Sequence, residues 1–164
     1  MYHVGEFIVH PGQGVCKVEG IVKEPMAVYQ LMPIGQRHPM RISFPLASAD
    51  KLRPVLSRDE AMQIIEQYPN MKIDDFVGRS NEIEEEHFRS KIRSGTCRDS
   101  VRIVKTFRQR IAETQARNKK PPVVYERILK QASQRSLEEL AVALETTPED
   151  VRMLFEQRLD AVAG

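Results

Sequence analysis

Residues 6–22 read EFIVHPGQGVCKVEGIV, and this stretch decides the fold of the amino-terminal region. After its central PGQG, residues 15–22 alternate apolar with polar or small side chains, which is the pattern of a half-buried strand, and the short apolar run in EFIVH before the turn predicts a second strand. Gly12 and Gly14 tolerate the positive φ angles that a tight turn needs. The stretch therefore predicts a β-hairpin.

Three further apolar segments follow before the pattern changes. They are residues 27–32, 40–45 and 52–55, separated by polar or glycine-containing connections. Five short strands in so little chain predict a small open β barrel. From residue 57 the spacing becomes helical, and Ser57 with Glu60 forms a capping-box pattern. We therefore predict an α+β protein of two domains, residues 1–56 and residues 57–164.

The second domain is predicted to be an all-α bundle. Ile83, Phe88 and Ile92 share one face of a helix that ends at Gly95. Ser136 with Glu139 resembles a second capping box, and Thr147 followed by proline predicts the start of a last helix. The expected helices after the first are residues 82–93, 98–117, 123–133, a segment from 136, and 148–159.

Length and composition narrow the class of protein. The chain has 164 residues, of which 41% are hydrophobic and 29% charged, as in ordinary globular domains. It has no uninterrupted apolar run of about 18 residues, and its first twenty residues lack a signal-peptide core. Cys16 and Cys97 match neither a metal half-site nor a disulfide framework. We expect a cytoplasmic protein with two reduced cysteines.

Charge is strongly segregated along the chain. Residues 56–88 hold three basic and nine acidic side chains, whereas residues 89–135 hold fourteen basic and three acidic ones. A cationic surface of this kind attracts phosphates. We therefore favour binding to the nucleic-acid backbone over the alternative, a solvent-exposed face whose charges pair with the acidic segments on either side. The predicted DNA-binding residues are Arg89, Arg93, Arg98, Arg102, Lys105, Lys119 and Lys120.

Catalytic and metal-site motifs are missing from the sequence. The histidines lack metal-ligand spacing, and neither a nucleophile elbow nor a phosphate-binding loop occurs. The helix opened by Pro148 begins with acidic residues and is a poor reader of the DNA groove, so we interpret residues 136–152 as packing helices. We predict no catalytic residue, metal, cofactor, small-molecule substrate or membrane contact.

Several segments together resemble a known family. Residues 4–15 read VGEFIVHPGQGV, followed by VEGI at 18–21, ISFP at 42–45 and LRPV at 52–55. This series is similar to the CarD/CdnL family of bacterial transcription regulators, and the resemblance extends over essentially the whole chain. It implies that residues 1–56 form a Tudor-like barrel, shared with the RNA-polymerase-interacting domain of transcription-repair coupling factor.

The resemblance also implies partners and a mechanism. The barrel would bind the β subunit of bacterial RNA polymerase through a strand edge, while the helical domain would contact promoter DNA, mainly its phosphate backbone. Preferential binding to the melted promoter would stabilise the open complex. The candidate polymerase contacts on this basis are Lys23, Arg41, Ile42, Ser43 and Phe44.

The chain departs from the family at two positions. Family members commonly have a tryptophan wedge where this chain has Asn81 followed by four glutamates, and this chain contains no tryptophan. They also often have arginine where this chain has Ser43. Any DNA contact is thus expected to be electrostatic, through Arg98, Arg102 and Lys105.

Two alternatives remain open at this point. One is a protein-only adaptor that makes no DNA contact and binds acidic protein surfaces with its charged helices. The other is an enzyme whose catalytic groups are assembled only by tertiary contacts. Salt-dependent DNA binding would separate the first alternative from a DNA-contacting regulator.

Overall fold

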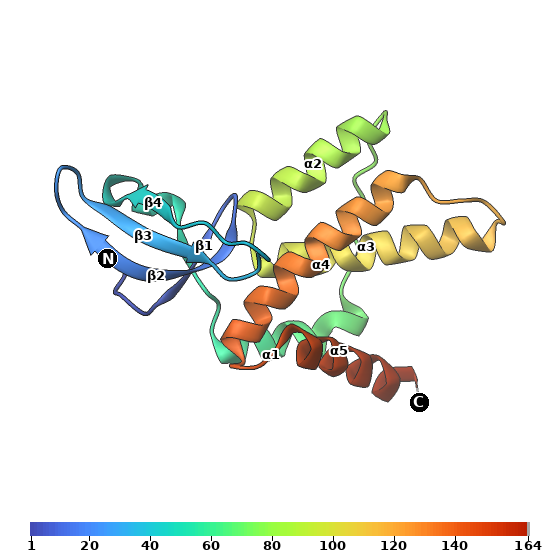
Figure 1. Ribbon diagram of the computed structural model, residues 1–164. Coiled ribbons are helices and arrows are strands. Elements are labelled where there is room, and N and C mark those ends of the chain that lie inside the picture. Colours follow the sequence, from blue (N-terminus) through green and yellow to red (C-terminus); the bar gives the residue numbers. More distant parts are fainter. Residues whose placement is uncertain (164) are drawn as a thin grey trace. The chain divides into compact units, whose positions relative to one another are not determined.

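The computed structural model describes residues 1–163 and divides into two compact units. We call Met1–Leu56 the sheet unit and the part from Ser57 onward the helical unit. The first consists mainly of an antiparallel sheet and the second of helices, so the protein is α+β as predicted (Figure 1).

The sheet unit contains five antiparallel strands in the order β4-β3-β2-β1-β5. The predicted hairpin is confirmed, because β1 pairs with β2 and Gly14 has a φ of 78° at the end of the turn. β4 and β5 are the two edges of this sheet. The bounds are β1 Phe7–His10, β2 Gly14–Val22, β3 Val28–Pro33, β4 Ile42–Pro45 and β5 Arg53–Pro54, with a 3-10 segment, η1, at Leu46–Lys51.

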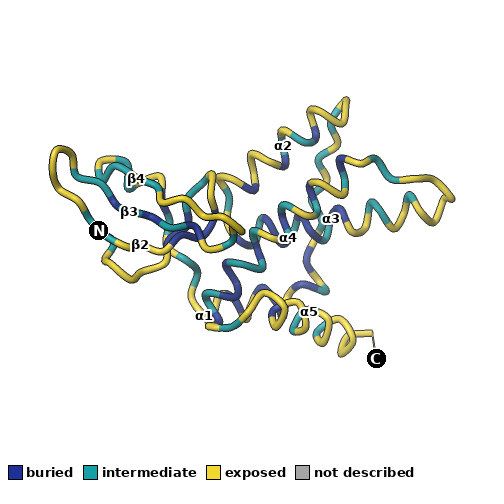
Figure 2. The backbone as a smooth tube through the Cα atoms, viewed as in Figure 1, coloured by how far each residue is buried: buried dark blue, intermediate teal, exposed yellow. Residues whose placement is uncertain are grey.

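The core of the sheet unit comes from inward-facing residues of β1, β2 and β3 and from Leu52, which precedes β5. Its buried cluster comprises Ile8, Cys16, Val18, Tyr29, Leu31 and Leu52. Figure 2 shows buried, dark segments within the strands of this unit. Removing these side chains from water is the main favourable term for the unit.

As far as Ala163, the helical unit contains five α-helices and a short 3-10 segment. They are α1 Arg58–Gln67, η2 Tyr68–Asn70, α2 Asn81–Ser94, α3 Cys97–Ala116, α4 Val123–Ala143 and α5 Pro148–Ala163. Its core cluster is built from α2, α3 and α4, and comprises Phe88, Ile92, Ile103, Val104, Phe107, Val124, Ile128 and Ala132.

Local signals set most helix ends. Ser57 and Glu60 form the predicted capping box, with Ser57 Oγ accepting from the Glu60 amide at 3.1 Å. Ser80 and Thr96 cap α2 and α3, and Thr147 Oγ accepts from the Asp150 amide at the start of α5. Gly95 ends α2 as expected, and a Cβ at this glycine would meet the Lys91 carbonyl oxygen at 2.4 Å.

Two predictions about the helices are wrong. Ser136 begins no helix: it lies inside the continuous α4, where its hydroxyl donates to the Ala132 carbonyl oxygen at 2.8 Å. A serine hydroxyl inside a helix can donate its hydrogen bond to a carbonyl oxygen of the preceding turn. A capping sequence pattern alone therefore does not start a helix. Ile83 is 49% exposed rather than buried, and Glu84 takes the inward position beside it.

No helix within residues 1–163 combines the length and the apolar character needed to cross a membrane.

Candidate functional site

The exposed edge of β4 offers unpaired backbone groups. Leu46 donates its amide hydrogen to the Ala27 carbonyl oxygen at 3.0 Å, and the register pairs Ser43 with Gln30. Hydrogen-bonded and non-hydrogen-bonded pairs alternate along antiparallel strands. Leu46 and Ala27 form a hydrogen-bonded pair, so the residues two and four positions earlier in the chain, Phe44 and Ile42, also direct their backbone groups toward β3. Ser43 lies between them, and its amide and carbonyl therefore point away from the sheet.

The side chains of β4 divide between the two faces. Ile42 and Phe44 pack against the buried cluster of the sheet unit, and the Phe44 ring meets the His10 ring edge-on at 5.3 Å. Ser43 lies on the opposite face and is exposed, with its hydroxyl 3.4 Å from the Gln30 side-chain oxygen. Of the predicted contacts, Ser43 is thus available to a partner, while Ile42 and Phe44 mainly support the strand.

The remaining predicted contacts lie at different places in the sheet unit. Arg41 precedes β4, is exposed, and forms an ion pair with Glu19 on β2 at 3.1 Å. Lys23 is exposed in the β2–β3 connection, outside β4. Met40 is 78% exposed immediately before Arg41. Sequence reasoning missed Met40, because an apolar residue beside a strand is ordinarily assigned to the core.

Lys105 is not part of an exposed basic ridge. Its Nζ donates to the carbonyl oxygens of Tyr68, Pro69 and Met71 at 2.9, 2.9 and 2.6 Å. An ammonium group has three donors, and these contacts use all of them. The predicted phosphate contact is replaced by a structural one, in which α3 holds η2 in place. Burial lowers the pKa of this ammonium group.

The other predicted cations of α2 and α3 occupy varied environments. Arg89 and Arg93 are exposed and lie 3.9 and 4.0 Å from the carboxylates of Glu85 and Glu86. Arg98 and Arg102 are half-buried, and Arg102 Nε is enclosed without a hydrogen-bond partner in the described part of the chain. The structure therefore does not bring the three predicted α3 cations together on one open face.

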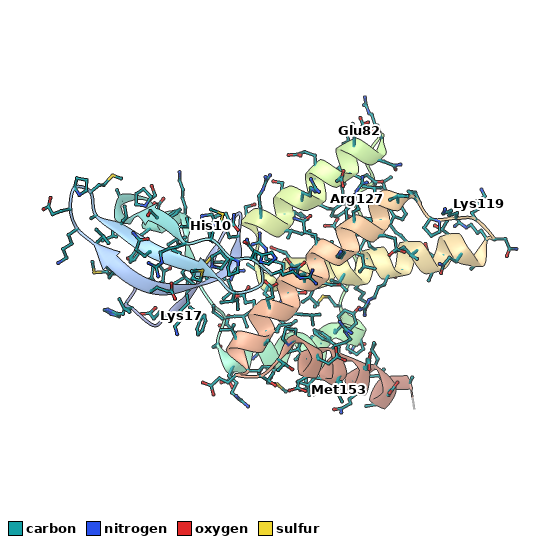
Figure 3. All side chains as sticks on the ribbon, viewed as in Figure 1. His10, Lys17, Glu82, Lys119, Arg127 and Met153 are labelled. Atoms are coloured by element: carbon teal, nitrogen blue, oxygen red, sulfur yellow. The ribbon has the colours of Figure 1, made fainter. Side chains whose placement is uncertain are left out.

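Lys119 and Lys120 are exposed cations away from the paired carboxylates of α2. They lie in the turn between α3 and α4, where Asn118 adopts a φ of 58°, and both are exposed. Lys119 is labelled at this turn in Figure 3. Among residues 1–163, neither ammonium group has a recorded ion pair with a carboxylate. Asparagine tolerates the left-handed conformation that this turn requires.

A buried ion pair organises the middle of the helical unit. Arg110 donates to Glu84 at 2.7 Å and also to the Phe76 carbonyl oxygen, so it joins α3 to α2 and to the connector before α2. Its guanidinium lies 4.8 Å from the centroid of the Phe107 ring. Sequence reasoning missed this pair, because neither residue shows from its spacing that it points inward.

The start of α2 is acidic, and its Glu84 and Glu85 have cationic partners on other helices. Ser80 caps the helix, Glu82 lies in its first turn, and Glu85 accepts from Arg127 of α4 at 3.0 Å. Carboxylates in a first turn interact favourably with the helix dipole. Asn81 is exposed at this end. The carboxylates near Asn81, one of them paired with Arg127, fit packing of α2 against α4 better than contact with phosphates.

No group of three or more histidine, cysteine, aspartate or glutamate residues within residues 1–163 is arranged to hold a metal ion.

Comparison with known proteins identifies the sheet unit. Residues 2–56 match the family model described as the CarD-like/TRCF RID domain. A search of curated proteins finds no match to the chain. The matched range includes all five strands and the exposed β4 edge. Residues 2–56 therefore form a CarD-like/TRCF RID domain, and the protein that carries it is an RNA-polymerase-interacting one.

Proposed function

We propose that the protein is a bacterial transcription regulator whose sheet unit binds the β subunit of RNA polymerase through the edge of β4. The single observation that carries this proposal is the outward-facing backbone of Ser43, at an open sheet edge inside a CarD-like/TRCF RID domain. An unpaired edge strand can extend its sheet by pairing with a strand of a partner. Binding of this kind requires no chemical reaction. Because RNA polymerase is cytoplasmic, we place the protein in the cytoplasm as well.

Replacement of Ser43 by proline tests edge pairing directly. Proline removes the outward amide hydrogen but leaves the hydrogen bonds that Ile42 and Phe44 make to β3. We expect Ser43→Pro to weaken binding of the full chain to purified RNA polymerase by about tenfold or more, because one intermolecular hydrogen bond is lost and a carbonyl of the partner is left unsatisfied. Surface-immobilised polymerase with optical detection gives the dissociation constants.

The matched control is Ser43→Ala, which removes the hydroxyl and keeps the amide. We expect it to bind within about twofold of the unchanged protein. Both variants are compared by circular dichroism and thermal unfolding to establish that the sheet is intact. A folded Ser43→Pro variant with undiminished affinity would place polymerase binding elsewhere on the sheet unit.

We further propose that the helical unit contacts promoter DNA through phosphates, with the turn at Lys119 and Lys120 as the main contact. These two cations are exposed and have no ion pair with any residue from 1 to 163, whereas Lys105 is used internally. Arg89 and Arg93 can join them, since exposed ion pairs contribute only about 0–1 kcal/mol and exchange readily for phosphates. Binding favoured by the melted promoter would then stabilise the open complex.

Binding to duplex and forked DNA at several salt concentrations tests the phosphate contact. We expect Lys119→Glu to weaken binding and to reduce the slope of log K against log salt by about one or more, because a phosphate contact is removed. Lys72→Glu, at an exposed lysine outside this turn, is the matched control. The half-life of promoter complexes with RNA polymerase measures the effect on the open complex.

A second candidate function is the protein-only adaptor. It is favoured by the extent of internal pairing in the helical unit, where Lys91 binds Asp74, Arg110 binds Glu84 and Arg127 binds Glu85. The adaptor predicts no DNA binding by the full chain at near-physiological salt. It also predicts equal behaviour of Lys119→Glu and Lys72→Glu in the DNA assay.

A further inference from the structure

An open groove lies between α1 and α5 in the helical unit. It has a volume of about 590 Å³, and it includes the α4–α5 turn at Leu144, Glu145 and Thr146. The two helices contribute residues at helical spacing, so each presents one face to the groove. The lining from the helices is Arg58 and Met62 on α1, and Asp150, Met153, Leu154 and Gln157 on α5.

The floor of the groove is apolar and partly exposed to water. Met62 is 39% exposed and Met153 is 47% exposed, and Leu154 is half-buried between helices. Figure 3 labels Met153 on α5, and Figure 2 shows how much of this helix is exposed. Flexible thioethers adapt to varied apolar partners, which makes methionine common on protein surfaces that bind helices.

The rim of the groove is acidic. Ser57–Gln67 and Leu144–Ala163 together carry eight acidic and three basic side chains. All three basic groups have partners within the helical unit: Arg58 donates to the Leu144 carbonyl oxygen, Arg152 pairs with Glu149, and Arg158 donates to the Glu66 carbonyl oxygen. The carboxylates that line the groove itself are those of Glu145 and Asp150, and Asp150 accepts a hydrogen bond from Thr146 Oγ1 at 2.5 Å. Arg58 is the one cation of the lining. Because acidic side chains outnumber basic ones in the flanking segments by eight to three, the field around the groove is negative.

We propose that the α1–α5 groove binds a basic amphipathic helix of a partner protein. An apolar stripe at helical spacing would cover Met62, Met153 and Leu154, and flanking lysines or arginines would meet Glu145 and Asp150 at the rim. Helix-in-groove recognition uses this combination of apolar anchors and complementary charge. Nucleic acid does not fit, because the rim carboxylates repel phosphates.

A second copy of this chain lacks the matching surface. Its basic segment is residues 89–135, and in the described α2, α3 and α4 the exposed large apolar side chains are Ile83 and Val123. Val123 lies beside the acidic Glu82 and Glu85, so these two side chains do not form an apolar stripe along a basic face. The occupant we infer is accordingly a different protein.

The test uses the full chain and a fluorescent Leu/Lys model peptide of about 14 residues, with leucines at helical spacing. We expect saturable binding by fluorescence anisotropy. Met153→Glu should weaken it about tenfold or more, because it places a charge on the apolar floor. This substitution adds a negative charge, so simple attraction to the cationic peptide would predict tighter binding instead.

Matched variants separate the groove from general effects. Met26→Glu makes the same change at a 58% exposed methionine of the sheet unit and should bind within about twofold of the unchanged protein. Met62→Glu repeats the test on the facing helix. Glu145→Gln should weaken binding a few fold and reduce its salt dependence. Circular dichroism establishes that each variant remains helical.

Several outcomes would overturn the proposal. These are absence of saturable binding, equal binding of a Leu/Glu peptide of the same pattern, or Met153→Glu binding as tightly as the unchanged protein. Sedimentation velocity adds a fourth: a dimer that Met153→Glu converts to monomer would assign the groove to a second copy. None of these outcomes depends on polymerase binding, which Ser43→Pro tests independently.

Discussion

At the scale of single residues, charge in the sequence does not reveal where a charged group is used. Lys105 and Lys119 look equivalent as members of one basic segment. In the structure, Lys105 binds three carbonyl oxygens at the end of η2, whereas Lys119 is exposed at a turn. The difference arises because a long side chain can reach buried carbonyls or water, depending on the neighbouring backbone.

Lys105→Met should destabilise the helical unit by about 2 kcal/mol or more. The substitution removes the charged donor, and the three carbonyl oxygens that it contacts lose their hydrogen-bond partner. The free energy of unfolding in urea measures the loss. Lys130→Met, at an exposed lysine of α4, is the matched control and should change stability by less than about 0.5 kcal/mol. Similar values for the two variants would contradict the structural role of Lys105.

The lowered pKa of Asp74 makes the stability of the folded protein depend on pH. Burial by itself would raise the pKa of this carboxyl, but hydrogen bonds from Lys91 at 2.7 Å and from the Phe76 amide at 2.9 Å lower its pKa overall. The pKa of Asp74 is thus lower in the folded protein than in the unfolded chain. Its carboxylate therefore stabilises the folded state fully at pH values above the unfolded pKa, and this stabilisation is lost as the pH falls through the folded pKa.

The corresponding variant is Asp74→Asn. The stability difference between unchanged protein and variant should be largest near neutral pH and should shrink as the pH falls below about 4, where the unfolded carboxyl takes up its proton. Urea unfolding at a series of pH values measures it. A difference that stays constant from neutral to acid pH would show that the pKa of Asp74 is not lowered in the folded protein.

At the scale of elements, caps that match the helix start were predictable and the continuity of α4 was not. Ser57 and Thr147 cap α1 and α5 as predicted, while the similar pattern at Ser136 lies in the middle of a 21-residue helix. A capping pattern begins a helix only where the capping residue itself has a non-helical backbone, as Ser57 does and Ser136 does not. Packing of α4 against α3 and α5 keeps the chain helical through Ser136.

This contrast gives a paired prediction. Ser57→Ala should destabilise the helical unit by about 1 kcal/mol, because the first-turn amide of Glu60 loses its acceptor. Ser136→Ala should cost less, since its hydroxyl only donates to a carbonyl already inside the helix. Chemical denaturation compares them. A larger loss for Ser136→Ala would indicate that α4 is divided in solution.

At the scale of the whole molecule, each unit has a core of its own. The sheet cluster includes Tyr29 and Leu31, and the helical cluster includes Phe88 and Phe107, whose rings meet edge-on at 4.8 Å. Separate cores allow polymerase binding and groove binding to be perturbed one at a time, which the proposed experiments use.

Phe107→Ala should destabilise the helical unit by about 3–5 kcal/mol, because it leaves a cavity at a fully buried ring. We expect the amide resonances of residues 1–56 to keep their positions in NMR spectra and polymerase affinity to be retained. A collapse of the sheet-unit resonances in this variant would mean that the two units fold as one cooperative body.

The sequence alone was enough to predict the hairpin, the change from strands to helices near residue 56 and the caps of α1 and α5, because these depend on alternation and on short-range hydrogen bonds. It could not show that Ser43 faces outward while Ile42 and Phe44 face the core, that Lys105 is used internally, or that Met62 and Met153 line one groove. Those features depend on strand register and on which helix faces meet, and long-range packing decides both.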